Sequence, residues 1–101
     1  GGGATKDKVK AALKIIQSDK NVKCILVNIF GGISKGDEVA KGIVSAMKTD
    51  SKSIPIVVRL EGTNAKEGLS ILLNDSKNIT VVDSLEDATQ KAVNIVLERS
   101  F

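Results

Sequence analysis

Three short runs of consecutive apolar residues, separated by helix-length amphipathic segments, constrain what this chain can fold into. The runs are Cys24–Phe30, Ile54–Leu60 and Ile79–Val82. Strands that are apolar at successive positions are typical of parallel sheets with both faces buried, so we expect both faces of the first run to be covered. Pro55 is tolerated at the start of a strand but not in its middle, which places the beginning of the second strand.

Four segments with helical periodicity alternate with these runs. The first spans about Lys6–Gln17 and the second Gly36 or Asp37 to Lys48; the third follows Asn64 and ends near Leu73, and the last begins after Ser84. In the first helix we expect Thr5 to cap the amino end. Its inward residues are then Val9, Ala12, Leu13 and Ile16.

This order of elements predicts an α/β fold of right-handed βαβ units, a three-layer sandwich around a parallel sheet. The glycines before the first helix constrain the predicted sheet further, because in this architecture a glycine loop before a helix normally follows a strand. We therefore expect the first strand to be missing and one sheet edge to be open, through which copies could pair. The alternative is that Gly1–Gly3 is a flexible tail.

Composition excludes several functions for the 101 residues. The chain contains no His, Trp or Tyr and a single cysteine, Cys24. A histidine base, a phosphohistidine, a multi-cysteine metal site and aromatic stacking on single-stranded nucleic acid are therefore excluded. The net charge of +3 comes from scattered lysines, and no apolar run approaches the about 20 residues of a membrane span. We expect neither a nucleic acid nor a membrane as partner.

Two strand ends are candidates for binding, because ligands of open parallel sheets bind beyond the carboxyl ends of the strands. After the first strand, Gly31 and Gly32 leave backbone amides uncovered just before a helix, a place that suits a carboxylate or phosphate. Tight-turn geometry alone also explains such a pair of glycines. Asn28 could brace the adjacent loops or be a satisfied buried amide.

After the second strand, Arg59 offers a planar fork for a carboxylate, and Thr63 and Asn64 could donate hydrogen bonds. The structural alternative is that Arg59 pairs with Glu61 or Asp37, while Thr63 or Asn64 caps the next helix. Asn64 with Glu67 three residues on has capping-box spacing. No phosphate-loop or dinucleotide motif occurs, so a nucleotide-binding site within this chain is not supported.

The most distinctive parts of the sequence are three short strings: GGGAT (Gly1–Thr5), ILVNIFGGI (Ile25–Ile33) and IPIVVRLEGTN (Ile54–Asn64). Together they resemble the C-terminal ligase domain of the succinate–CoA ligase β-subunit family, and the resemblance covers essentially the whole chain. It implies a flavodoxin-like domain, residues 1–101, that is a fragment of a longer β subunit and inactive alone. Malate–CoA ligase and ATP-citrate lyase are related acyl-CoA ligases that share this pattern.

The resemblance also implies the reaction: succinate, CoA and a nucleoside triphosphate give succinyl-CoA, through a phosphohistidine on the α subunit of a heterodimer, in the tricarboxylic acid cycle. ATP or GTP and Mg²⁺ then belong to an upstream domain, and CoA mainly to the α subunit. The substrate-binding segment shared with the α subunit falls on Gly32, Ile33 and Ser34, with Gly31 adjoining. These residues would hold succinate and phosphate, and the resemblance implies no catalytic side chain, cofactor site or metal site within this chain.

The sequence departs from that family where Ser34–Asp37 follows the glycines, because a Cys-Asp pair is common there and Gly36 replaces the cysteine. We expect Gly36 to loosen the start of the helix. This departure leaves a malate–CoA ligase β domain as an alternative. A stand-alone flavodoxin-like binding module is the other. The compartment implied is the mitochondrial matrix for a eukaryotic source and the cytoplasm for a bacterial one.

Overall fold

The computed structural model describes residues 5–29, 35–50, 54–74 and 78–99. Within these ranges helices and strands alternate along the chain, as predicted. Their bounds are α1 (Lys6–Gln17), β1 (Ile25–Ile29), α2 (Gly36–Lys48), β2 (Ile56–Leu60), α3 (Ala65–Asn74), β3 (Ile79–Val81) and α4 (Leu85–Arg99). The strand boundary expected at Pro55 is confirmed, because β2 begins at the next residue.

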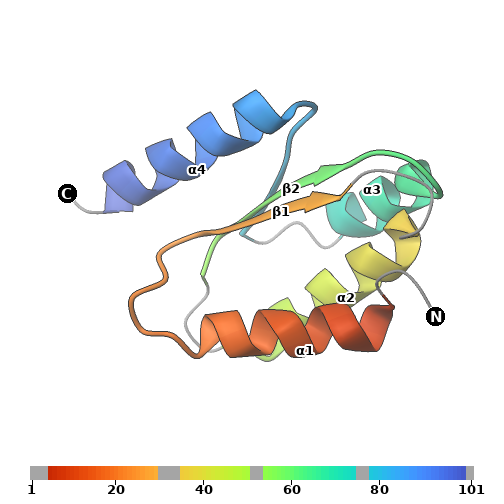
Figure 1. The fold of residues 1–101 in the computed structure, drawn as a ribbon, viewed down its shortest axis with the longest axis horizontal. Helices are drawn as coiled ribbons and strands as arrows, with labels where there is room; N and C mark the ends of the chain where they lie inside the picture. Colours follow the sequence, from red (N-terminus) through yellow and green to blue (C-terminus); the bar gives the residue numbers. More distant parts are fainter. Residues whose placement is uncertain (1–4, 30–34, 51–53, 75–77, 100–101) are drawn as a thin grey trace.

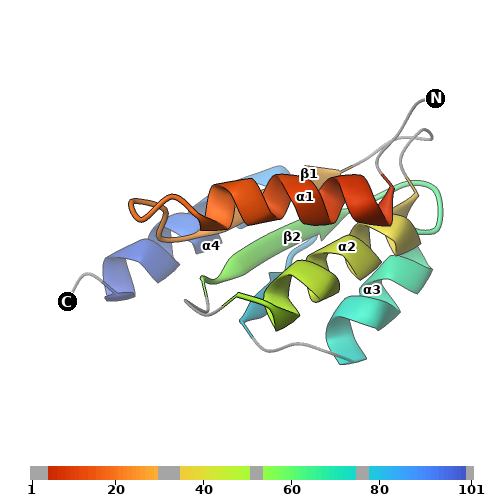
Figure 2. The same cartoon turned by 90° about the horizontal axis from the view of Figure 1, so that it is seen from below.

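The three strands form one parallel sheet in the order β1-β2-β3. Helices α1, α2 and α3 lie side by side against one face (Figure 2), and α4 lies against the other (Figure 1). The predicted three-layer α/β sandwich is therefore confirmed. Among the described residues β1 is an edge strand, paired only with β2, which agrees with the expected open edge.

The core lies between the sheet and α2. Central strand β2 and the inner side of α2 supply most of the fully buried side chains, and α3 adds one more. The largest of them are Ile56 and Val58 of β2, Val39 and Ile43 of α2, and Leu72 of α3; Val57 is also fully buried but is not part of this core cluster. Burial of such side chains is the main favourable contribution to folding, about 1.5–3 kcal/mol each.

The prediction that the first strand is covered on both faces is wrong. In β1 the burial alternates along the strand, with Leu26 39% exposed and Asn28 exposed. The reason is the position of β1 at the sheet edge, where the face that carries Leu26 and Asn28 is only partly covered by α4. Successive apolar residues indicated the parallel sheet correctly, but not which strand lies at its edge.

Helix α1 is capped as predicted: the Thr5 hydroxyl accepts a hydrogen bond from the Lys8 backbone N–H at 3.3 Å. The expected inward face is only partly right. Leu13 is buried, but Ala12 is exposed and Ile16 is 40% exposed. These two residues face outward because α1 packs mainly against α2.

Candidate functional site

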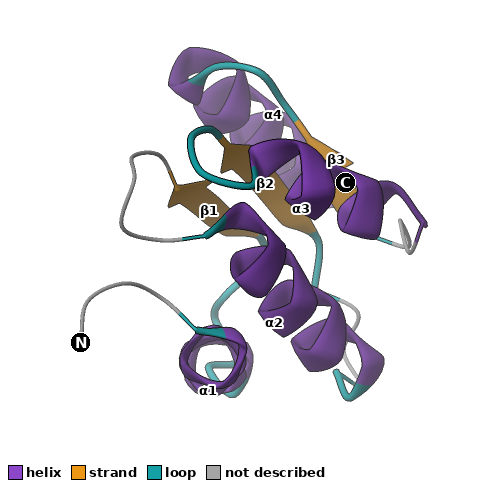
Figure 3. Ribbon diagram, turned by 90° about the vertical axis from the view of Figure 1, so that its right-hand side faces the viewer, coloured by secondary structure: helices purple, strands orange, loops and turns teal. Residues whose placement is uncertain are grey.

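The carboxyl ends of the strands and the amino ends of α2 and α3 lie at the same end of the molecule, which faces the viewer in Figure 3. We call this end the carboxyl rim; its described residues are Asn28–Ile29, Lys35–Asp37, Arg59–Asn64 and Asp83. The predicted binding residues Gly31, Gly32, Ile33 and Ser34 lie outside the described residues. The other binding candidates, Arg59, Thr63 and Asn64, are described.

Arg59 joins the ends of all three strands. Its Nη1 donates to Asn28 Oδ1 at 3.0 Å, and its Nη2 forms an ion pair with Glu61 Oε2 at 2.6 Å. Its Nε donates to the Asp83 backbone carbonyl at 3.3 Å. The side chain is 17% exposed, against 64% for Glu61. Of the alternatives for Arg59, pairing with Glu61 is the one that the structure contains.

Asn28 braces the rim from an exposed position on the edge strand, so the idea of a buried amide is wrong. Asn28 and Arg59 are direct neighbours in the parallel register, which brings the two side chains together on one face of the sheet. The sequence could have predicted this contact only if the register of β1 against β2 had been known.

The loop after β2 is tied to both chain segments that flank residues 30–34. On one side the Glu61 N–H donates to the Ile29 carbonyl at 2.9 Å. On the other side the Gly36 N–H donates to the Thr63 carbonyl at 2.8 Å. The 61–64 loop therefore fixes the distance between the end of β1 and the start of α2.

Asn64 also connects this loop to α2, but its side chain does not cap α3 as predicted. Its backbone is left-handed (φ 57°), and its side-chain Nδ2 donates to Asp37 Oδ1 at 3.1 Å. Asparagine tolerates this backbone conformation better than most residues. The side chain is thus used between two helices, and the capping-box spacing with Glu67 is not realised.

Hydrogen bonding lowers the pKa of Asp37 below its ordinary value of 3.8. The largest cause is the hydrogen bond from Asn64, and the backbone N–H groups of Asp37 and Glu38 contribute as well. These N–H groups belong to the first turn of α2, whose amides are the ones a helix leaves unpaired. The Gly36 N–H donates to the Thr63 carbonyl, so this amide of the first turn already has a partner within the protein.

Gly36 does not loosen the helix start; it is buried and tightly packed. A Cβ added there would lie 2.8 Å from the Asn64 carbonyl oxygen and 2.9 Å from the Ala65 Cα. Such contacts are too close for any side chain. The glycine is therefore explained by the close approach of α2 to the loop before α3, which sequence reasoning missed.

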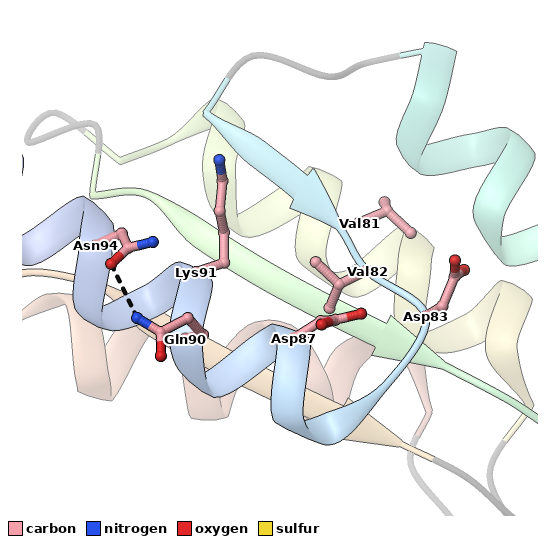
Figure 4. Close-up of a pocket in the computed structure, with 7 residues that line it drawn as sticks. All are labelled: Val81, Val82, Asp83, Asp87, Gln90, Lys91 and Asn94. Carbon is pink, nitrogen blue, oxygen red and sulfur yellow. Dashed lines mark hydrogen bonds between the residues drawn. The ribbon is translucent and has the colours of Figure 1, made fainter.

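A second feature was not singled out in the sequence: an open hollow of about 360 Å³ between β3 and α4. Asp83, Asp87 and Lys91 line it, together with Gln90, whose amide donates to Asn94 at 3.0 Å (Figure 4). The two carboxylates oppose binding of an anion, so this hollow does not provide the predicted carboxylate or phosphate site.

The residues that the structure describes hold no group of three or more His, Cys, Asp or Glu side chains placed to bind a metal ion. Nor does any helix in the described ranges combine the length and apolar character that a membrane crossing needs.

The fold and the rim define a flavodoxin-like α/β domain with its candidate site at the strand carboxyl ends. The sequence model of the CoA-ligase family matches residues 1–95, and the chain belongs to that family. It is 56% identical over 95% of its length to proteins named succinate–CoA ligase [ADP-forming] subunit beta from Rhodopseudomonas palustris (strain BisA53) and Pelagibacter ubique (strain HTCC1062). It covers 24% and 25% of those two proteins, about a quarter of their length.

A solved structure has the same fold: an ATP citrate lyase from Methanothrix soehngenii, in complex with citrate and coenzyme A. The TM-score is 0.70 at 21% identity, and the match covers 96% of this chain and 27% of that one. At this level of identity the likeness supports the three-layer fold alone.

Proposed function

We propose that the chain is the ligase domain of a succinate–CoA ligase β subunit, which contributes backbone groups to a succinate and phosphate site shared with an α subunit. The observation that supports this most is the 56% identity, over nearly the whole chain, to β subunits of that name. The intact enzyme joins succinate to CoA while a nucleoside triphosphate is cleaved to the diphosphate and phosphate.

In this proposal the domain binds and orients anions and takes no part in proton transfer. In the first turn of α2 the Gly36 N–H is already bonded to Thr63, and the next two amides act on the Asp37 carboxylate, whose pKa they help to lower. The proposed donors are therefore the amides of Gly31, Gly32, Ile33 and Ser34, supported by the positive end of the α2 dipole. Such donors suit the substrate carboxylate and the phosphoryl group, which are both negatively charged.

The remaining parts of the reaction are assigned to the rest of the enzyme. This chain has no histidine, so it cannot carry the phosphohistidine, which we assign to the α subunit. The described residues offer no metal cluster, and the sequence has no phosphate-loop motif. We therefore assign ATP or GTP and Mg²⁺ to the other part of the β subunit, and CoA mainly to the α subunit.

The proposal is tested by assembling the full-length β subunit that carries this chain with its α subunit. Succinyl-CoA should form from succinate, CoA and ATP or GTP, and neither subunit alone should form it. Faster turnover of malate than of succinate would instead identify a malate–CoA ligase. Calorimetric titration of the 101-residue chain with succinate and with phosphate should give no saturable binding, whereas tight binding would identify a self-sufficient module.

A further inference from the structure

We propose that Arg59 is a positioning residue: its guanidinium cross-links the ends of the three strands and so sets the geometry of the rim, without itself binding substrate. This inference rests on the proposed function. It replaces the sequence-based prediction that Arg59 offers its fork to a carboxylate.

The three nitrogens of the guanidinium each donate to an oxygen on a different segment of the rim. Asn28 Oδ1 lies on β1, the Asp83 carbonyl follows β3, and Glu61 Oε2 follows β2, which carries Arg59 itself. A guanidinium is planar and presents its donors in a fixed fork. A shift of one strand end relative to another would therefore break at least one of these hydrogen bonds.

The charge of Arg59 is already matched inside the protein. Glu61 Oε2 lies 2.6 Å from Nη2, a short charge-assisted contact. A substrate carboxylate would have to displace Glu61 and reach a side chain that is only 17% exposed. The geometry favours a structural role for the guanidinium over a role as a substrate ligand.

Asn28 is the residue through which Arg59 acts on the proposed site. It lies one residue before Ile29, whose carbonyl accepts from the Glu61 N–H at 2.9 Å. Arg59 thus holds Asn28, the residue next to Ile29, on one side of this link and Glu61 on the other. Small displacements of binding groups are costly: about 1 Å can reduce turnover by as much as about 10²-fold.

A double-mutant cycle in the assembled α/β enzyme tests the proposal with Arg59→Met, Asn28→Ala and the double variant. Arg59→Met should lower kcat/KM for succinate by about tenfold and Asn28→Ala by a few-fold. The double variant should lose no more than Arg59→Met alone, because both remove the same link. The KM values for CoA and for the nucleotide should stay within about twofold, which a general loss of structure would not spare. Lys20→Met, which removes an exposed positive charge from the turn after α1, is the matched control.

Losses that multiply in the double variant would show that Arg59 acts independently of Asn28, for example as a substrate ligand, and would overturn the proposal. If Arg59→Met fails to assemble, Asn28→Ala alone decides, and unchanged succinate kinetics would overturn it. A wild-type assembly that forms no succinyl-CoA would overturn the proposed function and this inference together. If the wild type is active and the losses in Arg59→Met and Asn28→Ala are independent, only the proposed role of Arg59 is overturned.

Discussion

Gly68 of α3 packs directly against the carbonyl group of Gly36 at the start of α2. A Cβ added to Gly68 would overlap the Gly36 carbonyl oxygen and lie 2.7 Å from its carbonyl carbon. The neighbouring group is backbone, so it cannot move aside as a flexible side chain could. This contact sets how closely α3 approaches the amino end of α2, and with it the position of the rim.

Replacing Gly68 by alanine is therefore expected to destabilise the chain, although alanine is the better helix former. Overpacking of this kind costs about 1–3 kcal/mol, against a gain of up to about 1 kcal/mol from helix propensity. Urea denaturation should show a lower free energy of unfolding for Gly68→Ala. Ser70→Ala, at an exposed position of the same helix, is the matched control and should be neutral or slightly stabilising. Equal stability of both variants would contradict the close contact.

Removing the Asn64 amide should raise the pKa of Asp37. The hydrogen bond from Asn64 is the largest cause of the lowered pKa, so in Asn64→Ala the value should move up toward 3.8. Titration of the Asp37 carboxyl carbon by NMR measures this directly. Ser70→Ala should leave the Asp37 pKa in place, and an unchanged pKa in Asn64→Ala would count against the contact.

The contact between Asn64 and Asp37 also predicts how the stability of the fold depends on pH. A carboxyl whose pKa is lowered by folding stabilises the folded state above its unfolded pKa, and this contribution is lost as pH falls through the folded pKa. The stability difference between wild type and Asp37→Asn should therefore be largest above pH 3.8 and shrink below it. Denaturation at neutral and at acidic pH tests this, and a difference that grows on acidification would contradict it.

The cap of α1 gives a fourth prediction. The Thr5 hydroxyl accepts from the Lys8 N–H, so Thr5→Ala should lower the free energy of unfolding by about 1 kcal/mol. Thr5→Ser keeps the hydroxyl and should retain most of the stability. If Thr5→Ser and Thr5→Ala lose the same amount, the cap contributes nothing and the prediction is wrong.

Local chemistry made much of the fold predictable from sequence. Pro55 placed the start of β2, Thr5 placed the start of α1, and successive apolar residues indicated a parallel sheet. Each of these signals depends on a residue and its immediate neighbours. That is why the order of elements and the three-layer architecture agree with the structure.

Contacts between distant segments were not predictable in this way. Asn28 was expected to lie within a covered strand, because an apolar run does not reveal which strand forms the sheet edge. The capping spacing at Asn64 was real, but a left-handed backbone turned its side chain toward Asp37. Gly36 was read as loosening a helix, whereas its role depends on a backbone approach from Asn64 and Ala65. The binding residues Gly31–Ser34 remain predictions, since they lie outside the described ranges.

The most direct measurement of the proposed anion site is the succinyl-CoA forming activity of the assembled enzyme with Gly32→Val in its β subunit. A branched side chain at this position should block access to the backbone amides proposed to bind the substrate carboxylate and phosphoryl group. Loss of one such donor typically costs about 10²–10³-fold in turnover, so kcat/KM for succinate should fall by about 10²-fold or more, with Lys20→Met unaffected. Activity of Gly32→Val within about twofold of wild type would contradict the central claim that this glycine corner forms part of the substrate site.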